Sequence, residues 1–441
     1  MFGMSGQLVG LLAAVSYSGE AIDPSPSEIL SETWRYSYAL QDPFWSQWQE
    51  FLGIADSDGN RYWKLCYLNL FRIGCSLRST DWDGNLRFET SLGEGDARAA
   101  QMNVDLVAGP VLVTSFYHSG LSANLFGRAI SDGSLLWTHS LRADFSGVSD
   151  VTIAGVTYDG AGRLVVATVA RDSTYWTYES AVFALSFDTG QTIWMRDLAR
   201  EYPTDSVTMW SPILDEIGNV YFSELYCRSD RCRWLVSSLD PKGGLRFETE
   251  VDPGFVPIGV AHGRLLVSNW YQEVAELLDV ESGSRIARIH GLVRNTVLIS
   301  RDLGFFVERP GPPDPTSVLR DRLALTAFDL GSGEIQWRFP LRSFESRSSP
   351  LLTDQGNILL IDKSALLEIS PRGELLRATR VQLKRQPVET IGVALLINGR
   401  WFSQSGATVV AYDVPGAPGE GRFGWNSLFG DAQHESRPRE K

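Results

Sequence analysis

The sequence predicts an all-β fold: a single eight-bladed β-propeller of four-stranded antiparallel blades, closed by an N-terminal strand. Three features support this prediction. A glycine turn followed by an aromatic residue recurs along the chain, and strand–turn–strand segments alternate with it. An additional strand is predicted near the N-terminus. The composition agrees, because 11% of the 441 residues are aromatic and 41 are glycine, which suit pleated strands and tight turns.

The recurring turn motif sets the length of one blade. Its glycines are separated by 40 to 57 residues, and a spacing near 40 fits a four-stranded blade. Glycine tolerates the positive φ of a hairpin turn, and the aromatic residue four positions later should face the neighbouring blade, since side chains alternate along a strand. Five of the seven motifs have this aromatic residue, whereas the other two have Ala287 and Arg377. The repeat residues are Gly84 with Phe88, Gly133 with Trp137, Gly190 with Trp194, Gly243 with Phe247, Gly283, Gly333 with Trp337, and Gly373.

Eight strand–turn–strand segments predict the inner strands of eight blades. They lie near residues 51–63, 104–115, 151–168, 211–222, 257–268, 296–307, 350–361 and 391–402. The last segment is followed by a third strand, Ala407–Asp413, but by no clear fourth strand. Thr33–Leu40 resembles the outer strands that begin near Trp137 and Trp337, so we expect it to pair with the last blade. Such pairing removes the open edge that a ring of sheets would otherwise expose.

The propeller should therefore occupy residues 31–414, after a flexible or signal-like segment at 1–30 and before a partly disordered extension at 415–441. The apolar run Leu8–Val15 has the length of a signal-peptide core, but no Lys or Arg precedes it. The run is too short to span a bilayer, so we expect no transmembrane segment. The net charge of −13 makes nucleic acid and anionic membranes poor partners, because affinity for phosphates comes mainly from basic residues.

The turn motif resembles the repeat of PQQ-type β-propellers. Ala327, Asp329, Ser332, Gly333 and Trp337 match the pattern Ala-x-Asp-x-x-Ser/Thr-Gly-x-x-x-Trp in full, and the resemblance extends from residue 33 to residue 413. The family includes quinoprotein alcohol dehydrogenases and non-catalytic exported members, such as the propeller lipoprotein of outer-membrane β-barrel assembly. The resemblance to these exported members implies that the repeat tryptophans pack between blades and that the protein lies in the bacterial cell envelope, periplasmic or extracellular.

No pattern in the sequence predicts an active site. The family's dehydrogenases use a disulfide between adjacent cysteines beside the quinone, and this sequence has no Cys-Cys pair. Residues 56–60 and 81–85 resemble fragments of calcium loops, but their place in the repeat favours plain β-turns. The five histidines are scattered, and neither H-E-x-x-H nor G-x-S-x-G occurs. We therefore predict no catalytic or metal-binding residues and no cofactor.

The four cysteines predict two disulfides, Cys66–Cys75 and Cys227–Cys232. Each pair brackets the connection between the second and third strands of a blade, where cross-strand cysteines can meet. The even number of cysteines, their local pairing and the exported family all indicate an oxidising compartment. The alternative is four free, buried thiols.

Aromatic residues in long loops predict a partner-binding face, because rigid scaffolds concentrate binding residues in loops and interfaces favour Tyr and Trp. The hypothesis is a non-catalytic, monomeric scaffold that binds a protein partner. Alternatives are free variation of loop sequence, an oxidoreductase or other enzyme that uses the propeller face, and a small-ligand sensor. The candidate residues are Tyr175, Trp176 and Tyr178 in blade three and Tyr117 and Phe126 in blade two, with a proline-rich loop at 309–315 in blade six.

Overall fold

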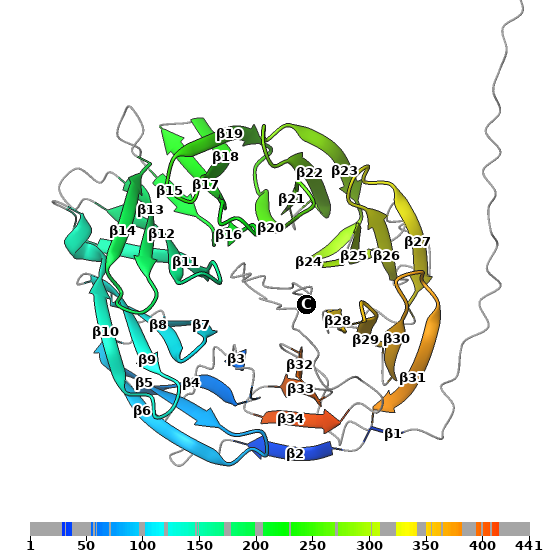
Figure 1. The fold of residues 1–441 in the computed structure, drawn as a ribbon, viewed down its shortest axis with the longest axis horizontal. Coiled ribbons are helices and arrows are strands. Elements are labelled where there is room, and N and C mark those ends of the chain that lie inside the picture. The colour runs from blue at the N-terminus through cyan, green and yellow to red at the C-terminus, as the bar shows by residue number, and fades with distance from the viewer. Residues whose placement is uncertain are drawn as a thin grey trace, which may run out of the picture.

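The described strands of the computed structural model form eight sheets that follow one another around a ring (Figure 1). The only helix among the described residues is a single 3-10 turn, η1 (Leu141–Asp144). The structure describes residues 29–30, 32–37, 54–55, 58, 60–69, 72–96, 102–118, 122–145, 148, 150–171, 178–198, 206–228, 231–269, 272–300, 302–308, 323–341, 350–353, 355–362, 365–381, 394–397, 400–405 and 408–413.

Each sheet is one blade, and its strands follow chain order from the centre of the ring outward (Figure 1). Blade one contains β3 (Ile54–Ala55), β4 (Arg61–Asn69), β5 (Arg72–Thr80) and β6 (Leu86–Asp96). Blade two contains β7 (Met102–Ala108), β8 (Val111–His118), β9 (Ser122–Ala129) and β10 (Leu135–Ser140). Blade three contains β11 (Asp150–Tyr158), β12 (Arg163–Arg171), β13 (Tyr178–Ser186) and β14 (Thr192–Asp197). Blade four contains β15 (Ser206–Met209), β16 (Ile213–Leu214), β17 (Val220–Arg228), β18 (Arg231–Leu239) and β19 (Leu245–Val251).

The second half of the ring repeats this order, and two strands from the N-terminal segment join its last two blades. Blade five contains β20 (Val256–Ala261), β21 (Arg264–Asn269), β22 (Val274–Asp279) and β23 (Arg285–His290). Blade six contains β24 (Leu292–Ser300), β25 (Leu303–Glu308), β26 (Ala324–Asp329) and β27 (Ile335–Pro340). Blade seven contains β28 (Leu351–Leu352), β29 (Ile358–Asp362), β30 (Ala365–Ile369), β31 (Leu375–Val381) and β1 (Ile29–Leu30). Blade eight contains β32 (Ala394–Ile397), β33 (Arg400–Ser405), β34 (Thr408–Asp413) and β2 (Glu32–Ser37).

The core lies between blades. The middle strands β12 and β13 are buried almost throughout, whereas the outer strand β14 is mostly exposed. A strand that neighbouring sheets cover on both faces needs apolar residues on both faces, which explains the near-continuous apolar sequence of β12. The buried clusters accordingly join adjacent blades: Leu125 of blade two and Phe183 of blade three belong to the same cluster.

Each outer-strand aromatic ring lies on the turn glycine of the next blade. A Cβ atom added to Gly190 would stand 2.5 Å from Cε3 of Trp137, and Gly190 has a φ of +68° that other residues adopt at a cost. The ring therefore occupies the space that only glycine leaves open. The same contact joins Phe88 to Gly133, Trp194 to Gly243, Phe247 to Gly283 and Trp337 to Gly373.

The three docked tryptophans also donate a hydrogen bond across the blade boundary. Nε1 of Trp137 lies 2.9 Å from the carbonyl oxygen of Phe187, and the indoles of Trp194 and Trp337 bind the carbonyls of Pro241 and Pro371 at 3.0 and 2.9 Å. A buried indole N–H needs such an acceptor. The turn thus supplies both a surface for the ring and an acceptor for its N–H group.

Register explains which residue faces each aromatic ring within its own blade. Trp137 pairs with Gly127 across the β9–β10 ladder, and in the corresponding ladders Trp194 pairs with Ala184 and Trp337 with Ala327. A small residue is needed there, because a Cβ on Gly127 would lie 2.1 Å from Cε2 of Trp137. The Ala of the sequence motif is therefore the small residue that pairs with the tryptophan within the same blade.

The N-terminal strand closes the ring, as predicted. β2 pairs antiparallel with β34 and takes the outer position of blade eight; it is described over Glu32–Ser37, and the last three residues of the predicted Thr33–Leu40 lie outside the described residues. Trp34 pairs with Ala411 after the same one-residue shift in register that precedes Trp137 in β10. Trp34 therefore occupies the register position of a docking tryptophan, and blade eight obtains this residue from the opposite end of the chain.

The boundary between blades seven and eight has a different construction. Blade seven has Arg377 in the place of the aromatic residue, and in blade eight no repeat turn joins the third strand to the fourth, because the fourth strand is β2. Here β1 pairs in parallel with the outer edge of β31, Ile29 with Arg380 and Leu30 with Val381. The sequence did not predict β1, which falls within the segment expected to be flexible. The N-terminal segment therefore joins both blades that meet at this boundary.

Truncation tests this closure. Removing residues 1–28 spares both strands and should leave the thermal midpoint unchanged. Removing residues 1–38 deletes β1 and β2, opens the edge of β34, and should cause aggregation or lower the midpoint by roughly 10 °C or more. Differential scanning calorimetry compares the two variants. Equal midpoints in the two truncated proteins would show that the ring does not depend on this segment.

Candidate partner-binding face

The described middle strands of the blades differ in length around the ring. The second and third strands have eight or nine residues in blades one to four, but five or six in blades five to eight. Each middle strand has one end at the connection between the second and third strands and the other end on the side of the repeat turn. The ends on the side of the repeat turn align from blade to blade, so the extra residues lie at the ends that the second-to-third connection joins. At about 3.3 Å per residue, these strands are roughly 7–13 Å longer than the described middle strands of blades five to eight. Residues 309–322, in the connection of blade six, lie outside the described residues. We call the four hairpins β4–β5, β8–β9, β12–β13 and β17–β18 the long-hairpin wall.

The predicted contact residues are strand residues wherever the structure describes them. Blade two has no long loop, because β8 runs through Tyr117 to His118 and β9, which begins at Ser122, contains Phe126. Phe126 is half-buried, and the guanidinium carbon of Arg128 lies 5.8 Å from its ring centre. The loop assignment was wrong because strand alternation continues almost to the end of the hairpin. The side chain of Tyr117, like the loop at 309–315, lies outside the described residues.

Blade three requires the same correction for Tyr178. This residue begins β13, packs against the buried cluster between blades three and four, and has the guanidinium carbon of Arg171 5.9 Å from its ring centre. It is therefore a boundary residue and not a loop-tip residue. Tyr175 and Trp176 lie outside the described residues, at the connection between β12 and β13.

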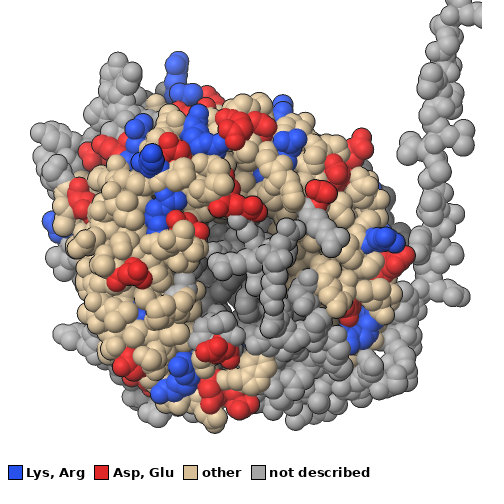
Figure 2. Space-filling model, in the orientation of Figure 1, with Lys and Arg blue, Asp and Glu red and all other residues tan. Residues whose placement is uncertain are grey.

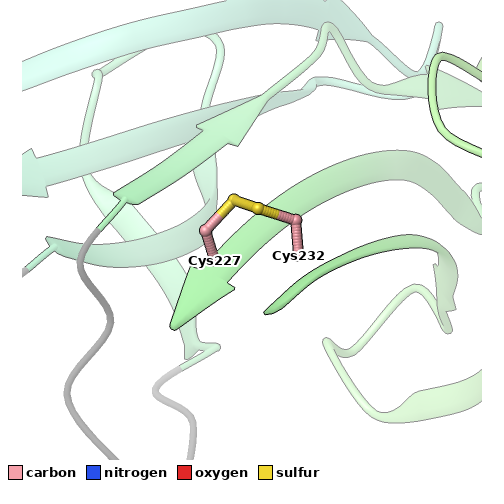
Figure 3. The surroundings of a disulfide bond; sticks show 2 residues. All are labelled: Cys227 and Cys232. Atoms are coloured by element: carbon pink, nitrogen blue, oxygen red, sulfur yellow. A yellow bond between two sulfur atoms is a disulfide. The ribbon is translucent and has the colours of Figure 1, made fainter. Parts of the chain in front are cut away.

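A disulfide joins the two strands of the blade-four hairpin near its end (Figure 3). Cys227 and Cys232 are direct partners in the β17–β18 ladder, and their Cα atoms are 4.0 Å apart. One of the two predicted disulfides is thus present. Cys66 and Cys75 are also direct partners, in the β4–β5 ladder of blade one, but their side chains lie outside the described residues.

Blades one and four are close copies of each other. Their middle strands have the same lengths at a constant offset of 159 residues, and both outer strands begin Leu-Arg-Phe-Glu-Thr, at Leu86 and Leu245. In each blade an arginine of the outer strand binds a tyrosine hydroxyl at 3.0 Å, Arg87 with Tyr62 and Arg246 with Tyr221. The duplication supports the second disulfide, because Cys66–Cys75 occupies the hairpin of blade one as Cys227–Cys232 occupies that of blade four.

The tyrosine in this cluster is structural. Burial and the neighbouring Asp215 raise the pKa of Tyr221 to about 12. The hydroxyl therefore stays protonated near neutral pH, donates to Oδ2 of Asp215 at 2.9 Å, and accepts from Arg246. A group held in this way supplies neither a base nor a nucleophile.

Two contacts of the long-hairpin wall were not anticipated from the sequence. The Ser180 hydroxyl of blade three donates to the buried carboxylate of Glu224 in blade four. In blade four the rings of Trp210 and Trp234 stack with centres 4.2 Å apart. Trp234 lies two residues after Cys232, so these two positions share one face of β18. The sequence gives this spacing, but it does not show which residue packs against Trp234. Both contacts involve the middle of the blade-four hairpin.

Among the described residues, no three or more His, Cys, Asp or Glu side chains come close enough to hold a metal ion. The disulfide links cysteines across a hairpin, not neighbours in sequence, and it lies in the long-hairpin wall. The described part of the face in Figure 2 has acidic and basic side chains interspersed, without a region of one sign.

Comparison with solved structures shows the fold. Europium-containing methanol dehydrogenase is similar with a TM-score of 0.51 and 11% identity, over 85% of this chain and 84% of that chain. The fold is that of a PQQ-type β-propeller. BamB from Moraxella catarrhalis matches this propeller with a TM-score of 0.49 and 15% identity, over 87% of this chain and 98% of that chain. Sqt1 from Chaetomium thermophilum matches with a TM-score of 0.46 and 9% identity, over 80% and 93%.

No protein-family model matches the sequence, and no curated protein matches it. Within the described part of this PQQ-type propeller, no helix is long and apolar enough to cross a membrane.

Thiol titration tests the second disulfide. Under denaturing, non-reducing conditions we expect no free thiol in the native chain and four after reduction. The variant Cys66→Ser should then release one thiol, from Cys75, and Cys227→Ser should release one from Cys232. Two free thiols in the unaltered chain would contradict the pairing of Cys66 with Cys75.

Proposed function

We propose that the protein is a non-catalytic scaffold of the cell envelope that binds a protein partner on the long-hairpin wall. The uneven strand lengths carry this proposal: in four consecutive blades the middle strands are longer than the described middle strands of the other four, whereas the docking contacts that hold the ring need only the repeat turns. Rigid scaffolds with projecting elements concentrate their binding residues on those elements. The similarity to methanol dehydrogenase concerns the fold, and a fold alone does not carry an activity.

The location rests on the disulfide chemistry. Disulfides persist in oxidising compartments and are rare in the cytosol, so a hairpin disulfide supports a periplasmic or extracellular site. The aromatic residues Tyr175 and Trp176, at the end of the blade-three hairpin, remain the candidate anchors of the interface. Large rigid side chains bind with a small loss of conformational entropy.

Site-specific photo-crosslinking in the source cell tests this proposal. A photo-reactive residue at position 176 should give a discrete protein adduct, identifiable by mass spectrometry. The same residue at position 242, an exposed turn position at the other end of the blade-four strands, should give none. Adducts of equal yield at both positions would contradict a partner on the wall.

Two tyrosine variants separate binding from folding. Tyr175→Ala should reduce the yield of the adduct and leave the thermal midpoint near that of the native chain. Tyr178→Ala should instead lower the free energy of unfolding by about 1–2 kcal/mol, because this half-buried ring packs at a blade boundary. A large loss of stability in Tyr175→Ala would show that this ring belongs to the core.

A further inference from the structure

The outer strand of blade three presents apolar side chains and backbone groups at the rim of the ring (Figure 1). Among the described strands, β14 pairs only with β13. Ile193 and Met195 flank the docked Trp194, and their side chains are 56% and 37% exposed. The N–H of Leu198 donates to the carbonyl of Ser180 in β13, so alternation along the strand turns the N–H and C=O groups of Met195 away from β13.

Most other outer strands carry charge at the corresponding positions, three and five residues after the turn glycine. Charged side chains on an edge strand protect it against pairing with another chain. Blades one, four, five and six have at least one charged residue there: Arg87 and Glu89, Arg246 and Glu248, Arg288, and Arg338. Blade two has Leu136 and Thr138. Among the seven repeat turns, both residues are apolar only in blade three and in blade seven, which has Leu376 and Ala378.

The apolar edge of blade seven shows what such a strand can do. β1, from the opposite end of the chain, pairs in parallel with Arg380 and Val381 on the outer side of β31. An outer strand of this ring can therefore pair with a further strand on its outer side. None of the described strands takes that place on β14.

We propose that an extended segment of the partner protein pairs with the outer edge of β14 as an additional strand of blade three. The proposal rests on the scaffold function above and adds a contact beside the wall, because the hairpin of the same blade carries Tyr175 and Trp176. Backbone hydrogen bonds, among them those of Met195, hold the segment, and its apolar side chains cover Ile193 and Met195. The partner segment is therefore an uncharged strand with apolar residues at alternate positions.

A segment of another protein fits β14 better than a second copy of this chain does. In an antiparallel pairing of two β14 strands centred on Met195, Ile193 of one copy lies opposite Asp197 of the other. A carboxylate then faces an apolar side chain at both ends of the pairing, which opposes burial of the contact. A partner strand with apolar residues in these places has no such conflict.

Peptide binding tests this inference. The probe is a fluorescein-labelled peptide of about 8 residues with alternating Val and Thr, and with one Lys and one Glu at its ends to balance the charge. The control peptide has Pro at two central positions, which removes backbone donors and leaves the charge unchanged. The fluorescence anisotropy of the Val/Thr peptide should rise on addition of the native chain, and that of the Pro peptide should not.

A charge on the edge should weaken this binding. Ile193→Lys should lower the affinity for the Val/Thr peptide about tenfold and, because the side chain is exposed, leave the thermal midpoint unchanged. The matched control is Gln336→Lys, at the same repeat position of blade six, where the side chain is exposed and Arg338 already charges the edge. It should bind as the native chain does. A lower midpoint of Ile193→Lys, an affinity equal to that of the native chain, or an equal loss in Gln336→Lys would each overturn the inference.

Hydrogen exchange locates the bound peptide. Exchange of the Met195 amide should slow when the Val/Thr peptide binds, since strand addition gives this N–H an acceptor. Unchanged exchange at Met195 in a chain that binds the peptide, or equal affinity for the Pro peptide, would overturn strand addition. A dimer of the native chain that Ile193→Lys converts to a monomer in analytical ultracentrifugation would overturn the assignment to a partner protein in favour of a second copy.

The two proposals fail separately. Peptide binding that depends on Ile193, with no adduct at position 176, would support strand addition and contradict the aromatic anchors. An adduct at position 176 without peptide binding would support the scaffold function and overturn strand addition to β14.

Discussion

The contact between an outer-strand aromatic ring and the turn glycine of the next blade holds this ring of sheets together. It requires glycine at the turn for two reasons, the positive φ and the absence of a Cβ, and it requires a small residue opposite the aromatic ring in its own blade. Side-chain hydrogen bonds within the turns stabilise the turn conformation that this contact requires. In the turn of blade six, the hydroxyl and amide of Ser332 bind Oδ1 of Asp329, and these hydrogen bonds lower the pKa of Asp329. These hydrogen bonds lie within the turn and do not involve the neighbouring blade.

The same contact explains why the chain closes as it does. A ring of sheets has one boundary where the first and last blades meet, and here the first segment of the chain supplies the outer strand of the last blade. Two boundaries lack the aromatic ring. Between blades five and six Ala287 lies on Gly333, and between blades seven and eight β1 pairs in parallel with β31. The ring cannot close until both ends of the chain are present. The second-to-third connections lie at the opposite end of the strands from the repeat turns. They do not take part in the contact between aromatic ring and glycine, so this contact does not constrain their length.

The sequence predicts most of the scaffold because the docking contact leaves a local signal. Gly190 and Trp194 can be recognised without any structure, since a turn and an aromatic residue recur at a fixed distance. β1 could not be predicted, because two residues pairing in parallel with a distant strand have no periodicity of their own. Tyr178 was assigned to a loop because a short aromatic run at the end of a strand resembles a loop with aromatic residues.

The most direct test of the docking contact compares Gly190→Ala with Gly263→Ala by chemical denaturation. The two glycines have φ values of +68° and +72°, so both variants bear the same backbone cost, about 1 kcal/mol. A new Cβ meets Trp137 at position 190, whereas nothing lies within 4 Å of it at position 263. We predict that Gly190→Ala loses about 2 kcal/mol more than Gly263→Ala, the cost of overpacking, and that the difference shrinks when Trp137 is also replaced by Ala. Equal losses in the two single variants would contradict the claim that the ring is held by aromatic residues on turn glycines.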